Sequence, residues 1–191
     1  GHFLPQIIEA VQAAKTGGLR LPVIYNSSGY EKAELLRQLE GTVDIYLPDF
    51  KFFSADIAGK YSNATDYAET AKAALAEMVR QTGKAAFDAE GIMQRGVIVR
   101  HLLLPGCLED SKRVLRYLYE AYGNVIYVSI MNQYTPMKHL KDYPELSRKI
   151  TEKEYEEAVD FAISIGVENG FIQEGDTASE SFIPPFDGEG V

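Results

Sequence analysis

The stretch GVIVRHLLL, residues 96–104, decides the fold class because it is an apolar strand with two polar side chains at its centre. Val, Ile and Leu in such a run favour a strand within a sheet. Arg100 and His101 point to opposite faces, since successive side chains alternate along a strand. A charge is costly in an apolar strand, so we expect Arg100 to pair with a carboxylate or to bind an anion. His101 fits packing and function equally well.

Further short apolar runs lie on both sides of this stretch and alternate with segments of helical periodicity. Strands are predicted at residues 21–25, 43–47, 96–104, 125–131 and 171–173. Helices are predicted at residues 4–16, 28–39, 55–82 with a break near 62–63, 111–122 and 151–165. This alternation predicts right-handed crossovers and a mostly parallel sheet. Five strands are too few to close an eight-stranded barrel, so we expect an α/β fold that is a partial TIM-like (βα) barrel or an open sheet.

Two local patterns make finer predictions. The apolar run at residues 21–25 is typical of a strand buried on both faces. Ser28 with Glu31, and Thr151 with Glu154, have the spacing of capping boxes at helix starts.

Composition is that of a globular protein with a single domain. The chain has 191 residues, of which 46% are hydrophobic. Its net charge of −9 argues against a nucleic acid or an anionic membrane as partner, because both bind basic surfaces. The sequence has no signal peptide and no apolar run of about 18 residues, so we expect a cytoplasmic protein. We expect the domain over residues 1–173 and an extended tail over 174–191.

Polar side chains follow the predicted strands, at the ends where parallel α/β folds bind ligands. The candidate site residues are Asn26, Ser27, Ser28, Asp49, Lys51, Arg100, Gln133 and Tyr134. Asp49 and Lys51 are two positions apart, so both side chains point to one face. Simpler interpretations stay open. The first three residues suit a turn and a cap, Asp49 with Lys51 suits a surface ion pair, and Tyr134 suits packing.

The motifs of several common catalytic sites are missing. The glycines form no phosphate-binding GxxxxGK or GxGxxG pattern, and neither GxSxG nor HExxH occurs. His2, His101 and His139 lack the spacing of metal ligands. Cys107 is the single cysteine, so this chain alone forms no disulfide and no cysteine-ligated cluster. The residues predict a pocket without a metal site and without a complete catalytic set.

Four blocks of sequence resemble, in order and spacing, one group of radical S-adenosylmethionine proteins. The blocks are VIYNSSGYE (23–31), VDIYLPDFKFF (43–53), RGVIVRHLLLPG (95–106) and VSIMNQYTP (128–136). The group is the branch similar to the pyruvate formate-lyase activating enzyme, and the resemblance runs from about residue 2 to residue 173. Four ordered blocks are more specific than a lone motif.

The resemblance implies a partial (βα)6 barrel that binds S-adenosylmethionine and a 4Fe–4S cluster. In this family a CxxxCxxC loop holds the cluster, and a GGEP-type segment binds the methionyl amino group. Neither segment is in the sequence, so the resemblance implies the distal part of a barrel truncated at its N-terminus. The full-length protein would cleave S-adenosylmethionine reductively and abstract hydrogen, with a partner glycyl-radical enzyme as one candidate donor. We expect this chain by itself to be inactive and to hold neither cofactor stably.

Carried over by position, the residues that match cofactor contacts of the family are Asn26, Ser27, Ser28, Asp49, Lys51 and Arg100. The first three match the strand end beside the ribose and methionine. Asp49 and Lys51 match a D-x-K pattern at the next strand end. Tyr134, with Gln133 next to it, falls where the activating enzyme has a histidine, so the chain departs from the family at this strand end.

Two other functions stay open. A complete TIM-like lyase or aldolase would use Lys51 as a Schiff-base amine. A non-catalytic binding module would recognise a partner protein through an exposed sheet edge, through which the chain could also self-associate.

Overall fold

Six strands form the sheet in the computed structural model, which describes residues 3–136 and 142–172. The strands are β1 (Ile24–Ser27), β2 (Ile45–Pro48), β3 (Ala86–Phe87), β4 (Met93–Leu102), β5 (Tyr127–Met131) and β6 (Gly170–Ile172). The α-helices are α1 (Leu4–Thr16), α2 (Ala33–Arg37), α3 (Ala55–Ser62), α4 (Tyr67–Thr82), α5 (Leu108–Tyr122) and α6 (Glu152–Ser164). Two short 3-10 helices, η1 (Gly123–Val125) and η2 (Pro144–Ser147), complete these elements. The expected α/β class is confirmed.

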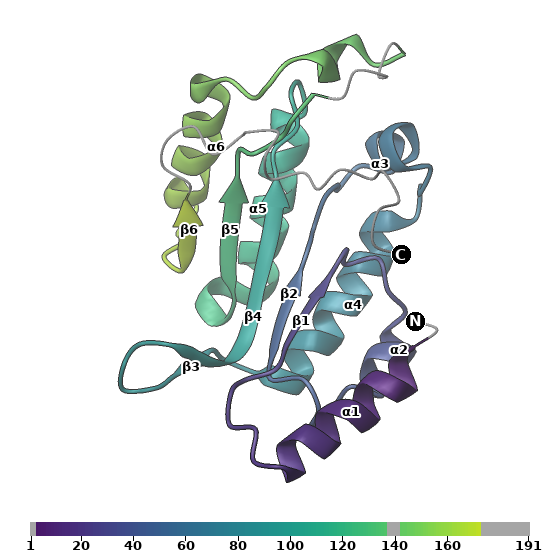
Figure 1. The fold of residues 1–191 in the computed structure, drawn as a ribbon. Coiled ribbons are helices and arrows are strands. Elements are labelled where there is room, and N and C mark those ends of the chain that lie inside the picture. Colours follow the sequence, from purple (N-terminus) through teal and green to yellow (C-terminus); the bar gives the residue numbers. More distant parts are fainter. Residues whose placement is uncertain (1–2, 137–141, 173–191) are drawn as a thin grey trace.

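The sheet is parallel except at one short hairpin. Its strand order is β1-β2-β4-β5-β6, and each neighbouring pair in this order runs parallel (Figure 1). β3 pairs antiparallel with β4, and the sequence did not predict it because two residues show no periodicity. The predicted mostly parallel sheet is confirmed, with β3 as an addition.

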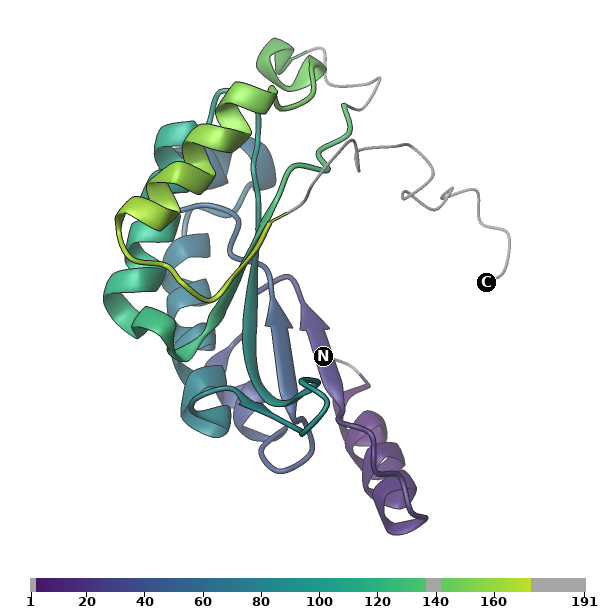
Figure 2. The ribbon, with the colours of Figure 1, turned by 90° about the vertical axis from the view of Figure 1, so that its left-hand side faces the viewer.

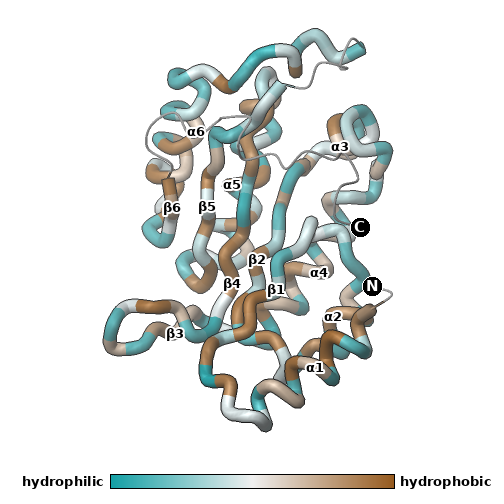
Figure 3. Tube along the Cα trace, in the orientation of Figure 1, coloured by the Kyte–Doolittle hydropathy of each residue, from teal (hydrophilic) through white to brown (hydrophobic). Residues whose placement is uncertain are grey.

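The two faces of the sheet differ in their cover. Helices α4, α5 and α6 lie along one face, whereas the strands are in plain view on the other, which we call the open face (Figure 2). Along β4, Val99 and His101 are buried, while Arg100 and Leu102 on the open face are half-buried. Figure 3 shows β4 as a mostly hydrophobic strand interrupted by a hydrophilic segment. The core therefore lies on the helix side, and the polar groups of the strand ends are left to the open face.

The expectation that residues 21–25 form a strand buried on both faces is wrong. β1 begins at Ile24 and lies at an edge of the sheet, where Ile24 is 57% exposed. Ile24 is exposed because β1 pairs with β2 alone among the described strands and because helices cover one face of the sheet (Figure 2).

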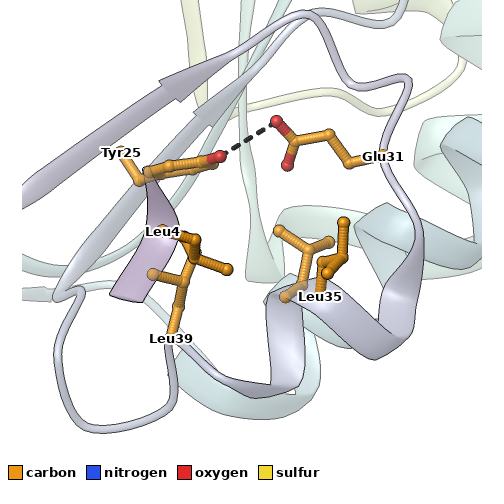
Figure 4. Close-up of a pocket in the computed structure, with 6 residues that line it drawn as sticks. Leu4, Tyr25, Glu31, Leu35 and Leu39 are labelled. Carbon is orange, nitrogen blue, oxygen red and sulfur yellow. Dashed lines mark hydrogen bonds between the residues drawn. The ribbon is translucent and has the colours of Figure 1, made fainter. Parts of the chain in front are cut away.

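The capping box expected at Ser28 and Glu31 is also wrong. α2 begins at Ala33, and Glu31 instead accepts a hydrogen bond of 3.0 Å from the Tyr25 hydroxyl. This pair borders a small hollow of about 40 Å³, whose other walls are leucines of α1, of α2 and of the turn after α2 (Figure 4). The contact between β1 and the half-buried Glu31 takes the place of the local cap.

Two other local predictions are confirmed. Thr151 Oγ1 accepts a hydrogen bond from the Glu154 N–H at 3.2 Å, and the Glu154 carboxylate accepts one from the Thr151 N–H at 3.0 Å. The predicted helix break separates α3 from α4, with Asn63 in the left-handed conformation at φ 50°. The tail expected over 174–191 lies outside the described residues. Among the described helices, none is long and apolar enough to cross a bilayer.

Asp110, in the first turn of α5, holds the segment that follows β2. Its carboxylate oxygens accept hydrogen bonds from the N–H groups of Phe53 and Ser54, both at 2.8 Å, and Asp110 is 5% exposed. We expect Asp110→Ala to lower the free energy of unfolding by about 2–4 kcal/mol, because two N–H groups would lose a charged acceptor. Urea denaturation measures this loss.

Glu109→Ala is the matched control at the neighbouring position. The Glu109 side chain is 84% exposed and pairs with Lys112 one turn along the helix. Its removal should change the free energy of unfolding by less than about 0.5 kcal/mol. Equal losses in the two variants would contradict the role given to Asp110.

Candidate functional site

Three charged side chains meet where β2 and β4 approach their carboxyl ends. Asp49 follows β2 and forms a parallel bridge with Arg100 of β4. The Arg100 Nη2 atom lies 2.6 Å from Asp49 Oδ1, and the Lys51 Nζ atom lies 3.4 Å from Asp49 Oδ2. The prediction that Arg100 pairs with a carboxylate is confirmed. Asp49 and Lys51 also form the ion pair that was the simpler interpretation of their spacing, with the Asp49 side chain 16% exposed.

These three charged groups, which we call the ion cluster, line a hollow of about 200 Å³. Its remaining walls are the apolar side chains of Phe52, Leu102, Leu104 and Met131. Such an arrangement, with few polar groups among apolar walls, is typical of small-molecule sites. The apolar walls are not among the residues predicted from the sequence, although Leu102 and Leu104 follow Arg100 at the two-residue spacing of one strand face.

The ion cluster keeps unused capacity for hydrogen bonds. Asp49 Oδ1 and Arg100 Nε are both buried, and neither has a hydrogen-bond partner among the described residues. The close contact of Asp49 Oδ1 with Arg100 Nη2 is thus an ion pair without the geometry of a hydrogen bond. Two cations around one carboxylate leave a positive excess, so the hollow suits a ligand with an anionic group.

The predicted residues of the first strand end are only partly near this cluster. Asn26 is exposed, and its register partner Leu47 lies two residues before Asp49 on β2. Ser27 is buried, and its hydroxyl accepts a hydrogen bond from the Gly29 N–H at 3.0 Å, as a turn residue does. The Ser28 carbonyl accepts a hydrogen bond from the Tyr67 hydroxyl. Asn26 thus remains a candidate for ligand contact, while Ser27 forms the turn.

Gln133 and Tyr134 do not line the hollow. The Tyr134 ring is buried and its hydroxyl donates a hydrogen bond of 2.8 Å to the Leu146 carbonyl. Gln133 Nε2 lies 3.4 Å from the Met131 sulfur. Tyr134 therefore packs against η2, which is the simpler of the two interpretations that its sequence allowed.

His101 and Cys107 are buried away from the hollow. His101 is 1% exposed, and its Nδ1 lies 2.7 Å from the Phe50 carbonyl. A carbonyl only accepts, so Nδ1 carries the proton. Burial lowers the pKa of His101 and raises the pKa of the Cys107 thiol. His101 therefore lies behind the main chain that carries Asp49 and Lys51, and its Nε2 atom is buried without a hydrogen-bond partner among the described residues.

The ion cluster is the group of described residues best suited to hold a cofactor. Arg100 and Lys51 can bind a carboxylate, and Asp49 can bind an ammonium or a hydroxyl group. Within residues 3–136 and 142–172, no three His, Cys, Asp or Glu side chains are grouped so that they could hold a metal ion. Two of the three histidines, His2 and His139, lie outside these residues.

Comparison with known proteins adds one distant relative. No family model matches the chain. The chain is 27% identical over 163 residues to an uncharacterized protein of Methanocaldococcus jannaschii. The match covers 85% of this chain and 44% of the relative, so the chain spans less than half the length of the curated relative it matches.

The buried His101 should make the protein less stable in mild acid. Because burial lowers its pKa in the folded state, the unfolded chain binds a proton that the folded chain does not. The free energy of unfolding should therefore fall as pH drops below about 6.5, with a slope of up to about 1.4 kcal/mol per pH unit. Urea denaturation at a series of pH values measures this slope.

His101→Gln is the control for this titration. Glutamine keeps an N–H donor for the Phe50 carbonyl but does not titrate. Its slope below about pH 6.5 should be clearly smaller than that of the wild-type protein. Identical slopes would show that other groups cause the acid sensitivity.

Proposed function

We propose that the chain is the distal part of a radical S-adenosylmethionine barrel and that the ion cluster binds the methionyl end of the cofactor. The observation that carries this proposal is the ion cluster itself, with two buried polar atoms left unpartnered beside a hollow at the strand ends. The mostly parallel sheet also supports it, because the ion cluster lies towards the carboxyl ends of the strands, where (βα) barrels bind their ligands. The choice of family in this proposal rests on the resemblance of the four sequence blocks named above.

The residues present fit S-adenosylmethionine. Arg100 and Lys51 offer charge-assisted hydrogen bonds for its carboxylate, and Asp49 holds both cations beside the hollow. Asn26, on the neighbouring strand end, offers amide groups for a sugar hydroxyl. When bound and reduced, this cofactor supplies a 5′-deoxyadenosyl radical that abstracts hydrogen. The chain's own part is to orient the cofactor by its charged end and to shield it with the apolar walls.

The hollow is smaller than a typical complete ligand site. It measures about 200 Å³, whereas pockets for small ligands span about 300–1,000 Å³. In the proposal, the ion cluster is therefore one wall of a larger site, and the remaining walls come from other parts of the barrel. This size supports the expectation that the chain by itself holds the cofactor weakly.

The 4Fe–4S cluster does not fit this chain's own residues. Such clusters are held by several cysteine thiolates, and the chain has the single Cys107, which is buried. In the proposal, a CxxxCxxC segment outside these 191 residues holds the cluster.

The exposed edge of β1 has a place in the same proposal. Ile24 is 57% exposed and Leu21 is 72% exposed, and β1 pairs only with β2 among the described strands. We propose that further barrel strands pair with this edge, which would also bury both side chains. Self-association through the edge is the competing expectation.

A glycyl-radical enzyme stays the candidate hydrogen donor.

The alternative of a Schiff-base lyase has less support. A Schiff-base lysine needs its amine free to attack a carbonyl, whereas the Lys51 Nζ atom forms an ion pair with Asp49 at 3.4 Å.

Lys51→Ala should weaken the binding of S-adenosylmethionine in the longer protein that carries the cluster segment. Loss of one charge-assisted hydrogen bond should raise KM for the cofactor roughly tenfold or more. The release of 5′-deoxyadenosine after reduction with dithionite measures this effect.

Lys15→Ala is the matched control, because Lys15 forms a similar ion pair with Asp44 at 3.1 Å, before β2 begins. It should leave KM unchanged. Unchanged KM in Lys51→Ala would count against the proposed site, and no cofactor cleavage by the wild-type protein would count against the proposed function.

The chain by itself should not assemble an iron–sulfur cluster, because Cys107 cannot supply a full ligand set. After incubation with iron and sulfide, we expect no stoichiometric visible absorbance of a 4Fe–4S cluster. The Cys107→Ser variant treated in parallel shows any nonspecific iron. A stoichiometric cluster in the wild-type chain that disappears in this variant would contradict the assignment.

A further inference from the structure

The hydroxyl of Tyr67, the first residue of α4, touches the main chain at the ends of two strands. It accepts a hydrogen bond from the Lys51 N–H at 3.0 Å. It also lies 3.0 Å from the Ser28 carbonyl and 3.2 Å from the Asp49 carbonyl. Two of these groups belong to the residues of the ion cluster, and the third follows β1.

One hydroxyl proton serves both carbonyls. A tyrosine hydroxyl has a single proton to donate, so Tyr67 bonds to Ser28 or to Asp49 at any moment, or shares the proton between them. Burial raises the pKa of Tyr67, so the hydroxyl stays a donor at neutral pH. When the proton goes to Ser28, the Tyr67 oxygen joins the end of β1 to the Lys51 N–H of the segment after β2. When it goes to Asp49, both hydrogen bonds hold the segment after β2.

The Tyr67 ring is held firmly enough to transmit this constraint. It is 3% exposed and stacks on Tyr30 with a centroid distance of 5.7 Å. The rings of Phe50 and Phe52 contact it edge-on, at 6.3 Å and 5.6 Å. The hydroxyl therefore has little freedom to move away from its three main-chain partners.

Gly29 brings the two strand ends close enough for one side chain to reach both. A Cβ atom at this position would lie 2.0 Å from the Asp49 carbonyl oxygen, and φ is +74°. Both facts favour glycine, because any larger residue would push the β1 turn off β2. Two features thus keep the strand ends together. One is the close main-chain approach at Gly29, and the other is the Tyr67 hydroxyl.

We propose that Tyr67 is a positioning residue that fixes Asp49 and Lys51 for ligand binding. The identity of the ligand rests on the proposed function. Tyr67 fixes residues 49–51 from the side of α4, while Phe50 is held by its N–H to the Arg100 carbonyl at 2.9 Å. Without the hydroxyl, the Lys51 N–H loses its acceptor and the Asp49 peptide is freer to rotate. Its carboxylate would then face Arg100 for less of the time.

The Tyr67→Phe variant tests this through amide hydrogen exchange of the present chain, followed by NMR. We expect exchange of the Lys51 amide to accelerate about tenfold, in line with the loss of one hydrogen bond. Tyr46→Phe is the matched control, since Tyr46 of β2 is also fully buried and its hydroxyl bonds to Gln81 on the helix side. It should leave Lys51 exchange unchanged. Unchanged Lys51 exchange in Tyr67→Phe overturns the proposal.

A second readout separates positioning from a general loss of structure. In the longer protein, Tyr67→Phe should raise KM for S-adenosylmethionine about three- to tenfold and leave kcat within about twofold. A variant that merely unfolds in part would lower the active fraction, and hence kcat, without a change in KM. An unchanged KM with active wild-type protein overturns the positioning role.

The two proposals fail in distinguishable ways. If the wild-type protein does not cleave the cofactor, the proposed function fails, and Lys51 exchange still decides whether Tyr67 fixes the strand ends. Tyr30→Leu serves as a milder variant, because Tyr30 is 42% exposed and supports the Tyr67 ring by stacking. It should accelerate Lys51 exchange less than Tyr67→Phe does, and no acceleration in either variant refutes the role of Tyr67.

Discussion

The carboxylate of Asp49 is the constraint on which the open face depends. An arginine within an apolar strand is costly unless an opposite charge lies close by, and Asp49 provides that charge at 2.6 Å. The same carboxylate draws Lys51 to the strand ends. One carboxylate neutralises one of its two cations, so a locally positive site persists in a protein with a net charge of −9. The positive charge of this site thus comes from two cations that share one carboxylate.

The core on the helix side makes this imbalance tolerable. Val97, Val99 and His101 of β4 are almost fully buried on that side, so apolar contacts stabilise the strand independently of the charges. His101 adds a hydrogen bond to the Phe50 carbonyl, next to Asp49 in sequence. The segment with the ion cluster is therefore held by packing on one face and by Tyr67 at its end. Rigid support of this kind is what a site needs to select one orientation of a ligand.

Much of the fold and part of the site could be predicted from the sequence, and the limits have physical causes. The periodic segments gave the helices and the parallel strands, and the cost of burying a charge gave the carboxylate partner of Arg100. The failed cap at Ser28 and Glu31 shows why a spacing pattern can mislead, since Glu31 instead bonds to the hydroxyl of Tyr25 on β1. The role of Tyr67 had no sequence signal, because its partners at positions 28, 49 and 51 are distant in the chain. The two-residue periodicity of β4 could have predicted the apolar walls of the hollow at Leu102 and Leu104, but this prediction was not made.

The β3 hairpin has a consequence for how the chain assembles. β2 ends at Pro48 and β4 begins at Met93, so their pairing closes a long loop. The chain loses entropy in closing this loop before the contacts between the strands can stabilise it. Such non-local pairing slows folding. By contrast, β3 ends at Phe87, a few residues before β4, and hairpins form within about 1–10 μs. The smallest strand of the sheet thus gives β4 a fast local template, on which the slow parallel pairings with β2 and β5 can follow.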